Sequence, residues 1–404
     1  MANKRIYFAI QGLAIKPEPI GAAVSTWADG DVVHGVQSVA VTTTFNLEQA
    51  FELGQLEIYE NIEGIPNIEV SASKVLDGYP PMFLLATQRA STPTLAGRSN
   101  PSCIVGLGVW DDSRENIASG LPQFKEISHM EASGMFVGSV TYNFPLDANF
   151  SEDITFVGNN KVWADAGCSE EDNGVWDTGY FNVPERMAHN ADQPFAETGS
   201  AGTDYGPEGG VNRRENMRFL TTAAAATTGK VDYTKLPTDI PGVVTNGVKN
   251  PECHVQSITV STDFGREELF ELGSRQPYSR VVTFPVEVTT DIEVLSVSGD
   301  LVNALGDGCG GSAGTCTNVV NNLSNQEIVI AACEGTRISA GTKNKLASVN
   351  YGGGDAGGGN VTVTYSYTTF NDFTVMHPLD PAPLWDWSQR VCSGWLGAND
   401  ATRV

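Results

Sequence analysis

The sequence predicts a mainly β protein that contains two tandem copies of one domain. One segment occurs twice without a gap, and the offset between its copies is 255 − 36 = 219. Residues 36–59 read VQSVAVTTTFNLEQAFELGQLEIY, and residues 255–278 read VQSITVSTDFGREELFELGSRQPY. Twelve positions are identical, whereas ordinary residue usage gives about one or two by chance. A repeat of this kind indicates a duplicated domain.

The composition agrees with β structure and with two domains. Val, Thr, Gly, Ser and Asn are plentiful and long helical patterns are absent, which favours strands. Hydrophobic residues make up 41% of the chain and charged residues 18%, so the chain is globular rather than disordered. A chain of 404 residues has room for two or three domains with buried cores, and the repeat favours two.

Local patterns predict the individual elements. The expected strands of the first copy are residues 5–10, 36–45, 55–59 and 68–76, and a short helix, MFLLAT, follows Pro81. The expected elements of the second copy are strands at 281–288 and 291–297 and a short helix at 300–305. Pro66 and Pro285 keep the offset of 219, but the alternation slips by one residue just afterwards, which indicates a bulge in one copy.

The two copies also end with similar segments. VTYNF at 140–144 resembles VTYSY at 363–367, and beyond them Asp153 and Asp372 are again 219 apart. Residues 166–210 are rich in Gly, Asp, Glu and Asn and have little periodicity, which is typical of a long irregular linker. The expected division is a first domain at 1–165, a linker or insertion at 166–210, a second domain at 211–380 and a C-terminal tail at 381–404.

The net charge of the chain argues against a nucleic-acid-binding protein. The formal net charge is −24, whereas binding to DNA needs clustered Lys and Arg that replace its counterions. Two interpretations stay open. One is an ordinary acidic, soluble surface; the other is a surface past which DNA moves without sticking.

No motif has the spacing of a catalytic or metal site. Ser312 lies in a G-x-S-x-G match, but the strand and helix that such a nucleophile needs are missing around it. The five histidines are scattered, and the seven cysteines show neither pair spacing nor a zinc pattern. No signal-peptide cleavage site follows the N-terminal apolar run, and no stretch reaches the ~20 apolar residues of a membrane span. We therefore expect no enzyme, no metal, no cofactor and folding in the cytosol.

The segment FELGQLEIYENIEGIPNIEVSASKVLDGYP (Phe51–Pro80) resembles the major tail tube proteins of tailed bacteriophages. The second copy departs from it, because Gln276, Pro277 and Ser279 replace residues of LEIYEN. The resemblance implies β-sandwich or barrel domains whose sheets join side by side into rings, and rings that stack into a hollow tube. Such a tube conducts genomic DNA into the host.

The duplication narrows what the resemblance implies about assembly. Most tail tube proteins form hexamers, whereas chains with a duplicated tube domain form trimers that mimic a hexamer. We therefore expect trimeric, pseudo-hexameric rings, with a ring of six chains as the alternative. The resemblance also implies contacts with other tail proteins, no specific DNA binding, no membrane, and a place in the virion tail after assembly in the host cytoplasm.

Two sets of candidate site residues follow. The FELG motif recurs in both copies and indicates either core packing or a subunit contact; its residues are Phe51, Leu53, Gly54, Phe270, Leu272 and Gly273. Acidic residues expected on strands of both copies are candidates for the wall of the lumen, with solvated outer faces as the alternative. These residues are Glu52, Asp153, Glu271 and Asp372.

Two other classes of protein remain as alternatives. One is a surface β-sandwich that binds carbohydrate or acts as an adhesin, against which the missing signal peptide counts. The other is an enzyme on a β scaffold, against which the missing acid–base pair counts.

Overall fold

The computed structural model describes residues 11–18, 31–54, 56–90, 92–110, 126–165, 211–219, 233–238, 240, 244–245, 248–249, 254–274, 277–296, 299, 325–332, 335–353 and 359–377. These residues are mainly β, as the sequence predicts. The expected strand at 5–10, the expected helix at 300–305, the linker 166–210 and the tail 381–404 lie outside the described residues.

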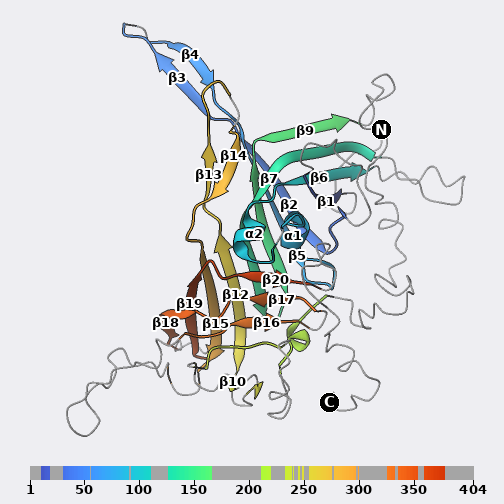
Figure 1. Cartoon of the computed structure of the whole chain (residues 1–404), viewed down its shortest axis with the longest axis vertical. Coiled ribbons are helices and arrows are strands. Elements are labelled where there is room, and N and C mark those ends of the chain that lie inside the picture. The colour runs from blue at the N-terminus through green and yellow to red at the C-terminus, as the bar shows by residue number, and fades with distance from the viewer. Residues whose placement is uncertain are drawn as a thin grey trace, which may run out of the picture.

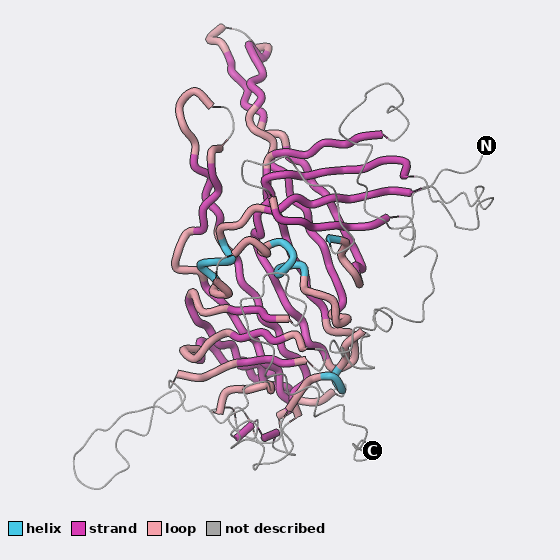
Figure 2. Tube along the Cα trace, turned by 45° about the vertical axis from the view of Figure 1, so that its right-hand side comes forward, coloured by secondary structure: helices cyan, strands magenta, loops and turns pink. Residues whose placement is uncertain are grey.

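One continuous antiparallel sheet runs through both copies of the repeat (Figures 1 and 2). Its strand order is β18-β19-β15-β12-β7-β8-β5-β2. The strands of the first copy are β2 (Val36–Thr44), β5 (Asn67–Val75), β7 (Glu126–Pro145) and β8 (Ser151–Gly158). The strands of the second copy are β12 (Val255–Asp263), β15 (Glu287–Leu295), β18 (Lys345–Gly352) and β19 (Thr362–Phe370). The chain is thus two similar half-sheets joined at β12 and β7.

The pairing register confirms the slip that the sequence predicts. Thr43 on β2 pairs with Ile68 on β5, and its equivalent Thr262 on β12 pairs with Val288 on β15. The offset is therefore 262 − 43 = 219 before the slip and 288 − 68 = 220 after it. The same irregularity also recurs in both copies, between Val36 and Ser38 and at the equivalent step of β12.

The expected equivalence of VTYNF and VTYSY is wrong. VTYNF lies on β7, whereas VTYSY lies on β19, which occupies the place of β8 beside the central strand. The registers instead match β7 with β18, at an offset of 349 − 140 = 209, and β8 with β19, at 365 − 154 = 211. All four strands alternate apolar and polar residues with period two, so alternation alone does not identify the partner.

A second layer covers one face of the long sheet. In the first copy it contains β1 (Gln11–Pro17), β6 (Cys103–Trp110), the first half of β7 and β9 (Asn160–Asp165). In the second copy it contains β16 (Val329–Ala331), β17 (Arg337–Ser339) and β20 (Thr374–Met376). The first copy has a second short helix, α2 (Leu95–Ser99), where one helix was expected. Apolar side chains from both copies form one core between these layers.

The first helix is anchored by a buried carboxylate. In α1 (Met82–Ala86) the N–H of Met82 donates to Glu152 Oε2 at 2.5 Å, and the N–H of Phe83 donates to Oε1 at 2.9 Å. The Tyr142 hydroxyl donates to Oε1 of the same carboxylate at 2.8 Å. Burial raises the pKa of Glu152, and the hydrogen bonds oppose part of that rise.

Two hairpins project from the same end of the sheet (Figure 1). The first arm consists of β3 (Leu47–Phe51) and β4 (Ile58–Glu63), and the second arm of β13 (Arg266–Leu269) and β14 (Ser279–Val282). The strand expected at 55–59 is wrong at its start, because Leu56 and Glu57 belong to the tip of the first arm. Short elements complete the described chain: β10 (Val244–Thr245), β11 (Val248–Lys249) and a 3-10 turn at Arg214–Asn216.

Candidate functional site

The two copies meet at a fully formed strand pair. β12 of the second copy pairs antiparallel with β7 of the first, so that Val260 lies opposite Tyr142 and Thr262 opposite Val140. All four side chains are buried on the core face. On the other face the junction is polar, where Thr259 Oγ1 donates to Asn143 Oδ1 at 3.3 Å. This junction is a built interface between two units of the same fold.

The ends of the long sheet are the counterparts of the two junction strands. β2 is equivalent to β12 and β18 is equivalent to β7, and each ends the strand order of the described sheet. The residues on the core face of these ends are less buried than their equivalents in the junction. Val41 is partly buried, whereas its equivalent Val260 is 1% exposed. The two end strands of the described sheet, β2 and β18, are therefore open edges that correspond to the two strands paired at the junction.

The FELG motif lies at the tips of the arms. Leu53 and Leu272 are fully exposed, and Phe51 and Phe270 are more than half exposed. The core-packing alternative is therefore wrong. The two glycines adopt positive φ, +94° at Gly54 and +92° at Gly273, as the turn requires. Because the equivalent residues have similar exposure, the internal junction covers neither tip.

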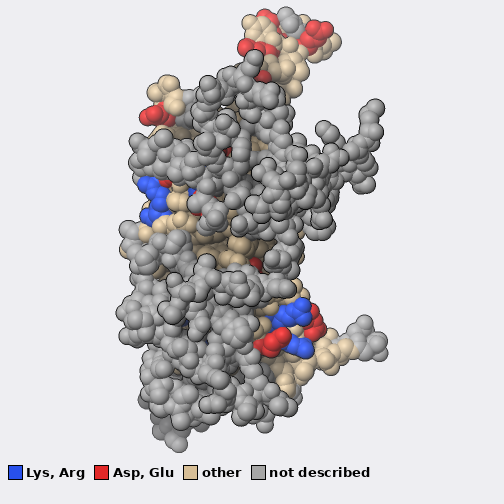
Figure 3. Space-filling model, turned by 90° about the vertical axis from the view of Figure 1, so that its right-hand side faces the viewer, with Lys and Arg blue, Asp and Glu red and all other residues tan. Residues whose placement is uncertain are grey.

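The two arms differ in charge. The first arm carries only acidic charges along residues 46–65, and these are Glu48, Glu52, Glu57, Glu60 and Glu63, all exposed. Figure 3 shows acidic side chains gathered at the projecting end at the top of the molecule. The second arm mixes both signs, with Arg266 and Arg280 beside Glu267 and Glu268. The apolar tip thus recurs in both arms while the flanking charges do not.

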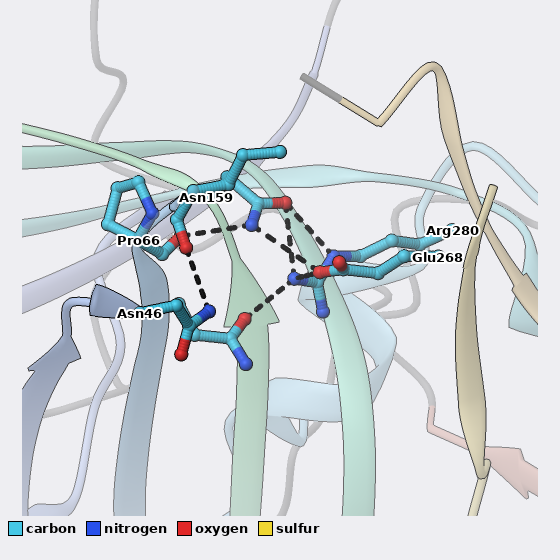
Figure 4. A network of polar contacts seen from close by, with 7 residues as sticks. Asn46, Pro66, Asn159, Glu268 and Arg280 are labelled. Atoms are coloured by element: carbon cyan, nitrogen blue, oxygen red, sulfur yellow. Dashed lines mark hydrogen bonds and ion pairs between the residues drawn. The ribbon is translucent and has the colours of Figure 1, made fainter. Parts of the chain in front are cut away.

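A polar network holds the base of the second arm against the first copy (Figure 4). The Arg280 guanidinium donates to Asn67 Oδ1 at 2.8 Å, to Asn159 Oδ1 at 3.1 Å and to Glu268. Asn159 in turn donates to the Pro66 carbonyl at 3.0 Å. Burial lowers the pKa of Arg280 and Glu268 opposes the change, so a buried cation is held by a charged partner.

The face of the long sheet that no second layer covers is polar, and it is called the open face here. Its acidic residues alternate with buried ones along the strands, and they are Glu69, Asp153, Asp263, Glu287, Asp291 and Glu293. Among the described strand positions of this face the basic residue is Lys345, at the first position of β18. Shallow hollows of the face are lined by Ser and Thr side chains such as Ser71, Ser139 and Thr141.

The structure separates the four acidic residues that the sequence grouped. Asp153 lies on the open face, where the Asn143 amide donates to it at 2.7 Å. Glu52 follows the end of β3, Glu271 lies in the tip beyond the end of β13, and Asp372 lies in the turn between β19 and β20. The expected strand positions are therefore wrong for these three. The sequence reasoning missed the acidic residues of β15, although their alternation in EVTTDIEVL predicts one polar face.

Among the described residues no group of three or more His, Cys, Asp and Glu residues gathers closely enough to hold a metal ion. No helix in the described part of the chain is long and apolar enough to cross a membrane.

Comparisons with known proteins gave only remote likenesses. No protein-family model matches the sequence, and no curated protein matches it. The tube-terminating cap of the anti-feeding prophage has a TM-score of 0.29 at 10% identity, over 41% of this chain and 95% of that one. The PVC sheath–tube complex, an extracellular contractile injection system, has 0.28 at 7%, over 41% and 94%. The Hcp1 protein of E. coli EAEC 042 has 0.21 at 14%, over 38% and 97%. With TM-scores below 0.5, these likenesses carry no conclusion about this chain.

Proposed function

We propose that this chain is the structural subunit of a phage tail tube, and that its rings close by pairing β2 of one chain with β18 of the next. The internal junction carries this proposal. β12 and β7 already form, within one chain, the strand pair that β2 and β18 would form between chains. A surface that is complementary to another surface of the same molecule generates a ring when the rotation closes.

The internal register dictates the register between chains. Val260 lies opposite Tyr142 in the junction, so Val41 would lie opposite Tyr351 of the neighbouring chain. By the same offsets of 219 and 209, Thr43 would lie opposite Val349. The pairing supplies the missing backbone hydrogen bonds of both edges and buries the partly exposed side chains of their core face.

The number of chains follows from the resemblance to tail tube proteins. A ring of six units needs three chains with two units each, because 3 × 2 = 6. We assign the open face to the bore because it is polar and acidic, and the second layer and the helices to the outside.

Axial stacking is assigned to the arms. Both FELG tips are exposed to a similar degree, so their partner must be one that both copies meet. A ring above or below presents itself to all units alike. Apolar tips on rigid hairpins then bury their surface against the adjoining ring.

An acidic bore suits the passage of DNA, because each contact of a phosphate with Lys or Arg would hold the polymer until it broke. We expect a net negative inner surface and no measurable affinity of assembled rings for duplex DNA at physiological salt. DNA binding that weakens with added salt, measured by fluorescence anisotropy, would contradict this assignment of the open face.

A cross-linking experiment tests the ring. Thr42→Cys combined with Asn350→Cys should join separate chains through a short bis-maleimide, because the two positions face each other across the proposed edge pair and are exposed on the open face. The matched control is Ser261→Cys with Thr141→Cys, which lie opposite each other within one chain on the open face and should give a cross-linked single chain. The unsubstituted chain, which has seven cysteines, measures the background. Failure of the first pair under conditions where the control pair reacts would overturn the proposal.

A further inference from the structure

One aromatic residue of the repeat is buried in one copy and exposed in the other. Phe45 and Phe264 are equivalent, each following the last residue of its strand, β2 or β12. Phe264 is 0% exposed, whereas Phe45 is 68% exposed. The residue type is the same, so its environment explains the difference. Phe264 follows the inner junction strand, and Phe45 follows the strand at the open edge.

Phe264 makes contacts with the other copy of the repeat. Its backbone N–H donates to the Gly138 carbonyl of β7 at 2.8 Å. Its ring stacks near Phe83 of α1, with centroids 6.2 Å apart and planes 18° apart. Gly138 lies at the irregular step of β7 between Val137 and Ser139. Phe264 is therefore an aromatic plug that the second copy inserts into the first.

A neighbouring cation completes the contact. The Arg266 guanidinium lies 4.8 Å from the centroid of Phe136 and 5.7 Å from that of Phe264. It also donates to the backbone carbonyls of Val137 and Ser99, each at 2.6 Å. Residues 264–266 thus dock on the first copy through the aromatic ring of Phe264, its backbone hydrogen bond and the two hydrogen bonds of the Arg266 guanidinium.

The open edge of the second copy presents the counterpart of that docking site. The irregular step of β7 recurs on β18 between Leu346 and Ser348, so Ala347 takes the place of Gly138. Lys345 takes the place of Phe136, while Leu47 of the first arm takes the place of Arg266. Leu47 is 60% exposed. At the internal junction the second copy supplies the basic residue and the first copy the apolar one, whereas at the open edges Leu47 is apolar and Lys345 is basic. The aliphatic stem of a lysine can cover a leucine.

We infer that Phe45 is an intermolecular plug that inserts into the second copy of the neighbouring chain beside Ala347, as Phe264 inserts beside Gly138 within the chain. This inference rests on the proposed ring and names one of its anchoring contacts. The partner of Phe45 is thus another molecule of this protein. The Phe45 N–H donates to the Ala347 carbonyl of the neighbouring chain, and Leu47 packs along the aliphatic stem of that chain's Lys345. An aromatic anchor at the centre of a subunit contact carries a large share of the association free energy.

Phe51, at the end of β3, supplies a matched control. Its exposed fraction of 66% is similar to that of Phe45, but its equivalent Phe270 is also exposed, at 55%. The internal junction therefore buries neither residue of that pair, and Phe51 is not part of the plug. Phe45→Ala should leave the thermal unfolding of the separated chain unchanged and raise the dissociation constant between chains at least about 10-fold. Phe51→Ala, made like Phe45→Ala in a Leu53→Asp, Leu272→Asp background so that rings do not stack, should leave thermal unfolding unchanged and alter the dissociation constant between the chains of one ring by no more than about twofold.

A photo-cross-link locates the plug directly. The full chain carrying p-benzoylphenylalanine in place of Phe45 should, after irradiation, join residues 345–349 of a different chain, as mapped by mass spectrometry of mixed heavy and light protein. Cross-links that fall within one chain, or on the arms, would overturn the inference. So would equal association of the Phe45→Ala and unsubstituted chains.

Edge pairing and the plug can be refuted separately. If the cysteines at positions 42 and 350 join separate chains while the cross-link from position 45 maps elsewhere, edge pairing stands and the plug falls. If the cysteine pair fails and the chains remain single, both fall.

Discussion

Tyr142 on β7 is 0% exposed, whereas Tyr351, its equivalent on β18, is 48% exposed. Both side chains face the core side of the sheet. β7 pairs with β12, whereas β18 is the last strand in the order of the described sheet. Tyr142 is thus part of the core of the single chain, whereas its equivalent Tyr351 is exposed at the edge of the sheet. This contrast predicts separate effects of one substitution at the two positions.

Tyr142→Ala should lower the free energy of unfolding by about 3–5 kcal/mol, as deletion of a buried aromatic side chain does. Tyr351→Ala should cost the single chain less than about 1 kcal/mol and should weaken association between chains about 10-fold. Denaturant unfolding and sedimentation equilibrium measure the two quantities. Equal unfolding losses, or unchanged association of Tyr351→Ala, would contradict the edge assignment.

The arm tips should matter for stacking and not for folding. Leu53→Asp with Leu272→Asp places charges at fully exposed positions, so the free energy of unfolding should change by no more than about 0.5 kcal/mol. Rings should still form, but tubes should not, because charged tips would lose water on contact with the next ring. Tube length in negative stain is the measurement.

Leu53→Ala with Leu272→Ala separates lost apolar contact from added charge, and should shorten tubes without abolishing them. A loss of several kcal/mol in the aspartate variant would instead restore the core-packing interpretation of FELG. Normal tubes in both variants would remove the arms from stacking.

Arg280 should fix the second arm. Arg280→Ala removes hydrogen bonds to Asn67, Asn159 and Glu268 and should cost about 2 kcal/mol, because hydrogen bonds of a buried charged group are strong. Amide exchange in β13 and β14 should rise. Asn61→Ala, the equivalent change on the first arm, should cost no more than about 0.5 kcal/mol because Asn61 is exposed. Unaltered exchange in Arg280→Ala would show that the arm is held by other contacts.

Glu152 should make stability fall as pH rises from about 4. Its pKa in the folded chain is raised by burial, so the folded state binds its proton more tightly than the unfolded state, where the value is about 4.3. The stabilisation is fully present below that unfolded value and is lost as pH rises through the raised folded value.

Comparison with Glu152→Gln isolates this group, because the amide does not titrate. The stability of the unsubstituted chain relative to Glu152→Gln should decline as pH rises through that window, as measured by denaturant unfolding at each pH. A difference that is constant, or that grows with pH, would contradict the assignment.

Much of the fold could be predicted from the sequence where a repeat or a local rule applied. The match of residues 36–59, which include β2, with residues 255–278, which include β12, rests on twelve identities, and the slip after Pro285 follows from alternation alone. The equivalence of β7 with β18 could not be predicted, because few residues are shared and alternation is common to every strand of the sheet. Pairing partners depend on tertiary contacts that period two does not encode.

The candidate site was predicted in part. FELG was identified by its recurrence, but sequence could not distinguish a buried motif from an exposed one. The contacts of Arg280 with Asn67 and Asn159 left no signal, because these two partners lie more than 100 positions away in the first copy. The role of Phe45 depends on a difference in burial between identical residues, which only coordinates reveal.

The mass of a single assembled ring tests the central claim most directly. Three chains of 43.0 kDa give 3 × 43.0 = 129 kDa, and native mass spectrometry of rings released by the aspartate arm variant should find that species. A top-view class average should then show six similar units around the bore. A ring of 258 kDa, from six chains because 6 × 43.0 = 258, or chains that remain single at high concentration, would contradict a ring of three chains closed through β2 and β18.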